Sequence, residues 1–236
     1  MKKVIPNTIT CLNLFTGCVA IFAAFQDSLV FAAWLVYLAA IFDFLDGMLA
    51  RLLHAYSEIG KQLDSLADMV SFGVLPGVIM FKLMQKAIQT SDWASLVTME
   101  LFPFLAFIMI IFSALRLAKF NIDSRQTSSF IGVPTPANTL LISSLPLILE
   151  NDLFQLHDLI LNPVVLLVLT IGMSLLLVAE IPLFALKFKN LTWKDNSIRF
   201  IFILITIPLL FLLKFAAIPL VIVLYILLSL LKPSYS

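Results

Sequence analysis

Four aspartates lie close together at the adjoining ends of two successive apolar stretches of the sequence. Asp43 and Asp46 form one pair, and Asp64 and Asp68 form a second pair further along the chain. Helical periodicity, at about 100° per residue, places the two members of each pair on one helix face. A charged aspartate inside a bilayer is costly unless it is paired or binds a metal, and two divalent cations would balance the four negative charges. Because carboxylate oxygens favour hard cations, the four aspartates are predicted to bind two Mg²⁺ or Mn²⁺ ions.

Small residues accompany the aspartates on the same helix faces. Gly47 and Ala50 fall on the face of the first pair, which would let a bulky ligand approach the helix backbone. His54 continues that face, although a histidine at the level of the lipid headgroups is commoner than a catalytic one. Gly60 and Ser71 fall on the face of the second pair.

Two other interpretations of the aspartates follow from their position in apolar helices. Isolated aspartates at helix ends usually face the headgroup region, and intramembrane carboxylates also mark ion or proton pathways. Four aspartates on two aligned faces, with small residues between them, argue against the first interpretation. The second, a divalent-cation transporter, would fit the charges but would not need Gly47, Ala50 and Arg51 at fixed places.

The composition places these aspartates in a membrane protein. Hydrophobic residues make up 61% of the 236 positions and charged residues 12%, and the mean hydropathy is +1.08, unlike a soluble domain. The formal net charge is only +1 and the basic residues are dispersed, so no nucleic-acid partner is expected. Cys11 and Cys18 are too far apart for a disulfide within one helix, and we interpret them as small core residues.

The hydrophobic pattern predicts an all-α protein, a polytopic bundle of transmembrane helices in a single domain that covers residues 1–236. A spanning helix needs about 20 apolar residues, and stretches of roughly that length are separated here by polar clusters. About eight spans are predicted: 8–25, 29–54, 62–84, 94–118, 137–149, 163–186, 198–213 and 215–231. The fifth is short and the last two are separated only around Lys214, so seven or nine spans stay open.

The distribution of Lys and Arg predicts the orientation of the bundle. In an eight-span arrangement that starts on the inner side, only Lys82, Lys86 and Lys214 lie toward the outer side. The other twelve lie on the inner side: Lys2, Lys3, Arg51, Lys61, Arg116, Lys119, Arg125, Lys187, Lys189, Lys194, Arg199 and Lys232. Short loops rich in Lys and Arg stay in the cytoplasm. Both termini and the aspartates are therefore predicted on the cytoplasmic side of the cell (inner) membrane.

The spacing of the aspartates and their neighbours resembles a known family signature. The pattern is Asp-x2-Asp-Gly-x2-Ala-Arg-x8-Gly-x3-Asp-x3-Asp, filled without departure by Asp43, Asp46, Gly47, Ala50, Arg51, Gly60, Asp64 and Asp68. It resembles the signature of the CDP-alcohol phosphatidyltransferases. The resemblance implies a six-helix catalytic core, usually a homodimer embedded among membrane lipids, with a dinuclear metal centre at the cytoplasmic membrane boundary. It also implies that Asp43, Asp46 and Asp64 are metal ligands, and that Asp68 is both a ligand and the general base.

A further set of residues is expected to bind the CDP-lipid. The resemblance places Gly47, Ala50 and Arg51 on the nucleotide side of this donor. Asn7 and Thr8 have two interpretations, since they could cap the first helix or contact a phosphate or a metal-bound water. The full set is Asn7, Thr8, Gly47, Ala50, Arg51 and Gly60.

Segments outside the signature resemble the phosphatidylserine synthase branch of that family. They are residues 5–8 with Asn13, 66–73, 114–121 and 130–136. This resemblance implies transfer of the phosphatidyl group of CDP-diacylglycerol to L-serine, giving phosphatidylserine and CMP. The stretch from Gly132 to Pro136 is also expected to form a rigid start to the fifth helix.

Three cations are candidates for binding the acceptor. A serine carboxylate must be held while the hydroxyl is aimed at phosphorus, and Arg116, Lys119 and Arg125 have suitable side chains. The cytoplasmic preference of basic residues would by itself also place them here. Glycerol 3-phosphate and inositol phosphate are alternative acceptors. Binding their phosphate dianions would require a denser set of basic residues than these three.

Overall fold

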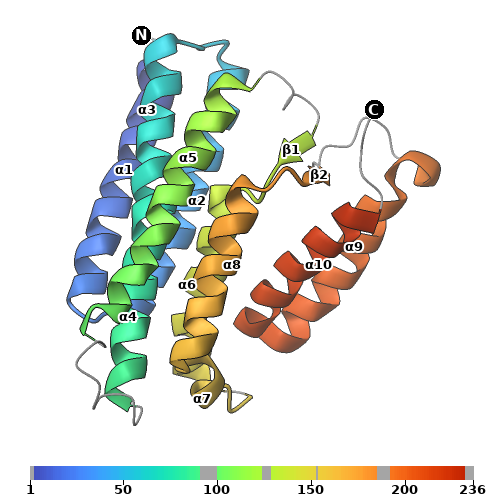
Figure 1. Ribbon diagram of the computed structural model, residues 1–236. Helices are drawn as coiled ribbons and strands as arrows, with labels where there is room; N and C mark the ends of the chain where they lie inside the picture. Colours follow the sequence, from blue (N-terminus) through green and yellow to red (C-terminus); the bar gives the residue numbers. More distant parts are fainter. Residues whose placement is uncertain (1–2, 91–99, 124–128, 153, 185–191, 232–236) are drawn as a thin grey trace.

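The protein is a bundle of long apolar helices (Figure 1). The computed structural model describes all residues except 1–2, 91–99, 124–128, 153, 185–191 and 232–236. The helical elements are α1 (Val4–Phe25), α2 (Leu29–Leu52), α3 (Glu58–Asp68), η1 (Met69–Val74), α4 (Leu75–Thr90), η4 (Phe102–Phe107), α5 (Ile108–Ile122), α6 (Thr135–Asn151), α7 (His157–Ile160), α8 (Pro163–Val178), α9 (Trp193–Leu213), η5 (Lys214–Ala216) and α10 (Ala217–Leu231). The predicted all-α class is confirmed.

Two three-residue strands are a feature that the sequence pattern did not predict. β1 (Ser129–Ile131) pairs antiparallel with β2 (Pro182–Phe184). The predicted sixth span, 163–186, was therefore too long. The backbone of Ala179 is extended, with φ −62° and ψ 139°, so α8 ends at Val178.

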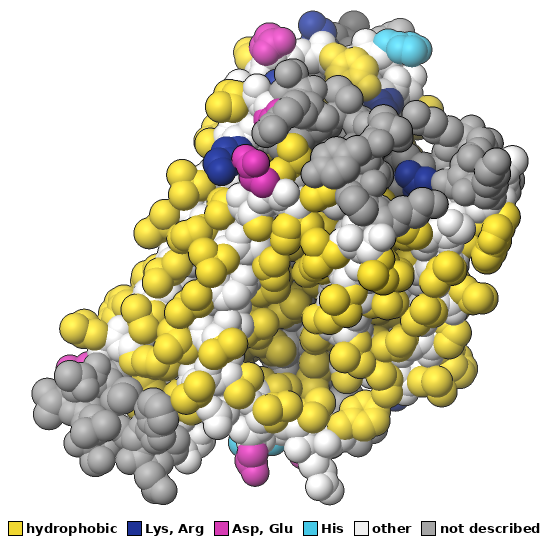
Figure 2. Space-filling view, turned by 45° about the vertical axis from the view of Figure 1, so that its right-hand side comes forward, with side chains coloured by type: hydrophobic (Ala, Val, Ile, Leu, Met, Phe, Trp, Pro, Cys, Tyr) yellow, Lys and Arg dark blue, Asp and Glu magenta, His cyan; other side chains and the backbone are white. Residues whose placement is uncertain are grey.

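Within the described part of the chain, five helical segments are long and apolar enough to cross a membrane, judged by length and composition. The last of them, Asn196–Leu231, is folded at Lys214 into the α9–α10 hairpin (Figure 1). The end of α10 and the start of α1 lie at the same end of the bundle, as expected for an even number of crossings. Figure 2 shows hydrophobic side chains over the middle of the visible face and charged side chains toward its two ends. The eight-span count stays a prediction.

Small residues bring α1 and α2 close together. Ala20 and Ala24 on α1, and Ala32, Val36 and Ala39 on α2, are almost completely buried. Small side chains at such a contact let two helix backbones approach closely in a membrane. This packing sets the amino-terminal part of α1 beside the carboxyl-terminal part of α2, where the first pair of aspartates lies. Cys11 and Cys18 lie on the opposite, exposed side of α1, so their interpretation as core residues was wrong.

The helix that carries the second pair of aspartates changes character directly after Asp68. Here η1, a π-helical segment, interrupts the α-helix, and a π-helical turn shifts the backbone hydrogen-bond pattern. The carbonyl of Phe72 accepts a hydrogen bond from the Thr139 hydroxyl of α6, at 2.8 Å. The Ser71 hydroxyl donates to the carbonyl of Asn13 in α1, at 3.1 Å. These bonds fix the helix on both sides just beyond Asp68.

Candidate active site

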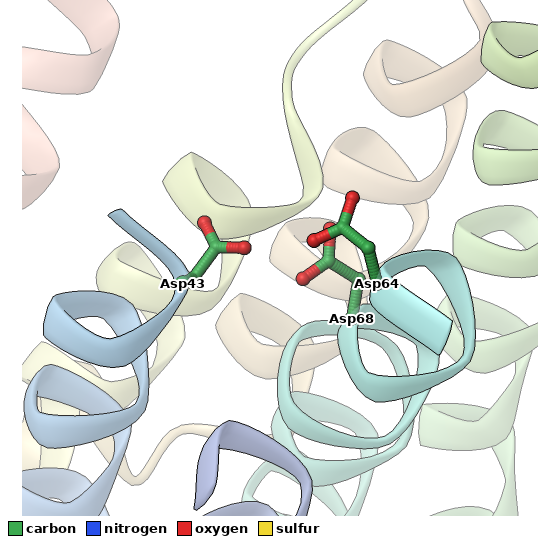
Figure 3. A group of neighbouring side chains, drawn as sticks. All are labelled: Asp43, Asp64 and Asp68. Atoms are coloured by element: carbon green, nitrogen blue, oxygen red, sulfur yellow. The ribbon is translucent and has the colours of Figure 1, made fainter. Parts of the chain in front are cut away.

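Three of the four aspartates form a compact cluster between α2 and α3. One carboxylate oxygen from each of Asp43, Asp64 and Asp68 lies within 4.8 Å of the other two, and all three side chains are half-buried. Figure 3 shows Asp64 and Asp68 on one helix, with their carboxyl groups facing the side of the site that Asp43 occupies. We call these three residues the aspartate cluster. Its donor set consists entirely of carboxylate oxygens, which suits a hard divalent cation such as Mg²⁺ or Mn²⁺.

The hydrogen bonding of Asp68 also fits a bound cation. Its Oδ1 atom is buried and has no hydrogen-bond partner among the described residues. A buried carboxylate oxygen without a partner is costly, and a metal ion would satisfy it. These residues therefore fit the divalent metal ions that the sequence predicted.

Asp46 is held separately from the aspartate cluster. Its side chain is only 5% exposed, and its Oδ2 atom accepts a hydrogen bond of 2.6 Å from the hydroxyl of Thr10 on α1. Sequence reasoning missed Thr10. Its position three residues after Asn7, on the same helix face, was a signal that it could lie near the site, but nothing local identified Asp46 as its partner.

A cavity of about 460 Å³ opens beside Asp46 and Asp64. We call it the first cavity. It contains five of the six residues predicted to bind the CDP-lipid: Asn7, Gly47, Ala50, Arg51 and Gly60. A Cβ atom added to Gly47 would meet nothing within 4 Å among the described residues. The space beside the α2 backbone is therefore available to a ligand, as the small side chain predicted.

The amino terminus of α3 forms one wall of the first cavity. Ser57 caps this helix, because its Oγ atom accepts a hydrogen bond from the Gly60 amide at 3.0 Å. A Cβ atom at Gly60 would lie 2.9 Å from Oδ1 of Asn7, so a side chain here would push Asn7 away. Arg51 and Lys61 line the same cavity. The helix terminus and these two cations make the cavity suitable for a phosphorylated ligand.

Two sequence interpretations in this region were wrong. Helix α1 begins at Val4, so Asn7 and Thr8 lie inside the helix and neither is its N-cap. The Thr8 hydroxyl donates to the carbonyl of Val4 at 2.9 Å, and Thr8 is not among the residues that line the first cavity. His54 does not continue the aspartate face, because α2 ends at Leu52 and His54 has a φ of 49°.

A second cavity, of about 310 Å³, contains two of the three cations predicted to bind the acceptor. Arg116 and Lys119, both from α5, line it, whereas Arg125 lies outside the described residues. The Arg116 side chain is 7% exposed, and its guanidinium carbon lies 4.8 Å from the centre of the Phe120 ring. Arg116 also interacts electrostatically with Asp68. This arginine therefore connects the second cavity to the aspartate cluster.

The second cavity also holds residues that the sequence interpretation did not select. They include Asp123, Ile131, Leu177 and Glu180. A signal for Glu180 existed, because a carboxylate inside the predicted span 163–186 is unfavourable and suggested that the helix ends before it. The stretch from Gly132 to Pro136 does form a rigid start to α6. Gly132 has a φ of +75°, and Pro134 precedes the first helical residue, Thr135.

The chain is similar to known proteins over most of its length. The family model for CDP-alcohol phosphatidyltransferase matches residues 3–179. A Helicobacter pylori protein named CDP-diacylglycerol–serine O-phosphatidyltransferase is 35% identical over 214 residues, covering 87% of this chain and 81% of the relative. A Bacillus subtilis protein of the same name is 32% identical over 177 residues, covering 75% of this chain and 88% of the relative. A third, from Methanocaldococcus jannaschii, is 36% identical over 138 residues, or 58% of each chain. From the signature residues gathered around one site and from this match, the chain belongs to the CDP-alcohol phosphatidyltransferase family.

Proposed function

We propose that the protein transfers the phosphatidyl group of CDP-diacylglycerol to L-serine, giving phosphatidylserine and CMP. The observation that carries the proposal is the position of Arg116. It lines the second cavity and is within electrostatic range of Asp68, so a group that can bind a carboxylate acts in the same region as a group that can accept a proton. The names of the relatives from three organisms support the choice of serine.

The donor lipid occupies the first cavity in this proposal. Its acyl chains remain among the membrane lipids, and its nucleotide side meets Gly47, Ala50 and Arg51. Asn7 and the amino terminus of α3, with Gly60, lie on the opposite wall and approach the phosphates. Asp43, Asp46, Asp64 and Asp68 would hold two Mg²⁺ or Mn²⁺ ions, which would supply positive charge to neutralise the phosphates and the leaving CMP.

The acceptor reacts from the second cavity. Arg116 binds the carboxylate of serine, with Lys119 and Arg125 contributing positive charge. Asp68 takes the proton of the serine hydroxyl, whose oxygen then forms a bond to the phosphorus next to the diacylglycerol. The bond from that phosphorus to the CMP oxygen breaks, and CMP leaves with the electron pair. The product forms in one displacement, without a covalent enzyme intermediate.

The orientation and assembly belong to the same proposal. The positive residues predict that both termini and the aspartate cluster face the cytoplasm at the inner membrane. The family resemblance further implies a homodimer, and residues 1–236 act as one domain. Two other functions remain as outcomes of the test: the same reaction with glycerol 3-phosphate or inositol phosphate, and divalent-cation transport.

The test is CMP release by the purified protein in detergent. CDP-diacylglycerol and Mn²⁺ are supplied with L-serine, glycerol 3-phosphate, inositol phosphate or ethanolamine. We expect CMP release that depends on L-serine and is much slower with the other acceptors. Faster release with glycerol 3-phosphate would show that the acceptor is wrong while the family reaction stands. Release with none of these acceptors would count against the transferase and in favour of a transport function.

A further inference from the structure

The second cavity carries ionisable groups of both signs. Among the described residues that line it, Arg116 and Lys119 are positive and Asp123 and Glu180 are negative. The two pairs cancel, so the described lining has no net formal charge. A phosphate dianion would meet two carboxylates in this space, whereas an amino acid zwitterion would find a partner for each of its charges.

The backbone on both sides of Glu180 is fixed against the start of α6. The amide of Gly132 donates to the carbonyl of Ile181 at 3.0 Å, and the amide of Val133 donates to the carbonyl of Leu176 at 2.9 Å. A side chain at Gly132 would collide with the carbonyls at the end of α8, and its φ of +75° also favours glycine. Residues 130–136, which resemble the phosphatidylserine synthase branch, therefore determine the position of Glu180.

Of the two carboxylates, Glu180 is the better candidate for contacting a ligand. Its side chain is exposed, whereas Asp123 already takes part in another interaction.

We propose that Glu180 binds the α-ammonium group of the acceptor while Arg116 binds its carboxylate, which makes the second cavity a site for a zwitterionic amino acid. The inference rests on the proposed function and adds a specificity-determining residue to it. It explains how a cavity with only two described cations distinguishes serine from phosphorylated alcohols. The serine hydroxyl is bound by neither of these two residues and is left free to react.

Glu180→Gln tests the inference, because it keeps the shape of the side chain and removes its charge. The Michaelis constant for L-serine should rise about five- to twenty-fold, the scale of a charge-assisted hydrogen bond that is partly screened by solvent. The kcat and the Michaelis constant for CDP-diacylglycerol should stay within about twofold, since neither depends on the ammonium group. Glu180→Asp should recover part of the affinity for serine.

A second acceptor separates charge recognition from a structural role. 3-Hydroxypropionate keeps the hydroxyl and the carboxylate of serine but lacks the ammonium group. The unaltered enzyme should use it poorly, and Glu180→Gln should leave its kcat/KM unchanged, so that the preference for serine falls. A merely structural effect would lower kcat/KM for both acceptors equally. Glu150→Gln, at the exposed carboxyl end of α6, is the matched control and should change neither value.

The outcomes separate this inference from the proposed function. If the unaltered enzyme uses serine but Glu180→Gln keeps the same Michaelis constant and acceptor preference, the role of Glu180 is wrong and the proposed function stands. If the unaltered enzyme uses 3-hydroxypropionate as efficiently as serine, ammonium recognition is excluded even without a variant. If the unaltered enzyme does not use serine at all, the proposed function and the inference both fail.

Discussion

At the residue scale, the bond between Thr10 and Asp46 shows how the site is oriented. A carboxylate on a helix can rotate about its side-chain bonds, and the hydroxyl of Thr10 holds one of its oxygens at 2.6 Å. Asp46 also lines the first cavity. Partners of this kind orient metal ligands and raise metal affinity. Thr10 is thus a positioning residue for Asp46.

Replacing Thr10 should weaken metal binding before it affects folding. We expect Thr10→Val to lower the affinity for Mn²⁺ about tenfold, the effect typical of removing a partner of a metal ligand, while Thr10→Ser retains most of it. Binding of Mn²⁺ to the purified protein, measured by electron paramagnetic resonance without substrate, gives the affinity directly. Thr16→Val is the control, because the partner of the Thr16 hydroxyl among the described residues is the carbonyl of Leu12 in its own helix, at 2.7 Å. Equal Mn²⁺ affinities for Thr10→Val and Thr16→Val would show that Thr10 does not position the ligand.

Arg116 should be sensitive even to the conservative change to lysine. Lysine keeps the charge but loses the two-pronged hydrogen bonding and the planar contact with Phe120. The Michaelis constant for serine should rise roughly ten- to a hundred-fold, since a charge-assisted pair contributes about 1.5–3 kcal/mol. Ethanolamine lacks the carboxylate, so its slow reaction should change little. If Arg116→Lys impairs CDP-diacylglycerol and spares serine, Arg116 belongs to the phosphate site.

Sequence reasoning identified site residues that lie near one another in the sequence. It missed site residues that only tertiary packing brings together. Asp43 with Asp46, and Asp64 with Asp68, share a face because of helical periodicity, which can be calculated without a fold. Thr10 lies 36 residues from Asp46, and Glu180 lines the same cavity as Arg116 because α8 packs against α5. Such contacts depend on tertiary packing, which a single sequence does not specify.

At the element scale, the π-helical segment η1 is the joint between the aspartate cluster and the bundle. It follows Asp68 directly and packs against α1, α5 and α6. The contact with α1 requires Gly17, because a Cβ atom there would collide with the Ser71 hydroxyl and would lie 3.1 Å from the Ser71 Cα atom. The position of Asp68 therefore depends on a small residue two helices away.

Gly17→Ala should destabilise the protein although alanine favours helices. The added methyl group pushes η1 away from α1, and overpacking of this kind costs about 1–3 kcal/mol. We expect a lower melting temperature in detergent and a reduced rate of CMP release. Gly172→Ala in α8 is the matched control, since a Cβ atom at Gly172 meets nothing within 4 Å among the described residues. A Gly17→Ala variant as stable and active as Gly172→Ala would contradict this role of the contact.

The elements themselves were predictable where the apolar stretches are long. Helix α2 was expected at 29–54 and spans Leu29–Leu52, because length and hydropathy identify such a helix. Strand β2 could not be foreseen, since three residues carry too little pattern and their pairing with β1 depends on the whole fold. The break at Lys214, with a φ of 51°, was correctly expected to separate two helices.

At the scale of the whole molecule, the two ends of the bundle differ in chemistry. The aspartate cluster and both cavities described for it lie toward the end where α1 begins and α10 ends (Figure 1). At the other end of α1, Lys82 forms an ion pair of 2.8 Å with Asp27. The hydrogen bond from Lys82 holds the pKa of Asp27 below its ordinary value. This asymmetry agrees with a bundle that exposes its reactive end to one aqueous compartment.

The orientation can be measured with alkaline phosphatase, which is active only outside the cytoplasm. A fusion after Ser236 should be inactive, because the distribution of Lys and Arg predicts a cytoplasmic carboxyl terminus. A fusion after Asn151, at the opposite end of α6, should be active and serves as the positive control. High activity of the Ser236 fusion would indicate an odd number of crossings. The predicted orientation would then be wrong.

The proposed function requires that the aspartates bind metal and catalyse phosphatidyl transfer to serine. The most direct measurement follows labelled L-serine into lipid and CMP into solution in one reaction, with purified protein, CDP-diacylglycerol and Mn²⁺. We expect equal amounts of labelled phosphatidylserine and CMP, and no product after chelation of the metal. In folded protein, the rate should fall by several orders of magnitude for Asp43→Asn, Asp46→Asn, Asp64→Asn and Asp68→Asn. CMP release without labelled lipid, or near-normal transfer by the Asp68→Asn variant or in the presence of the chelator, would contradict the proposed function.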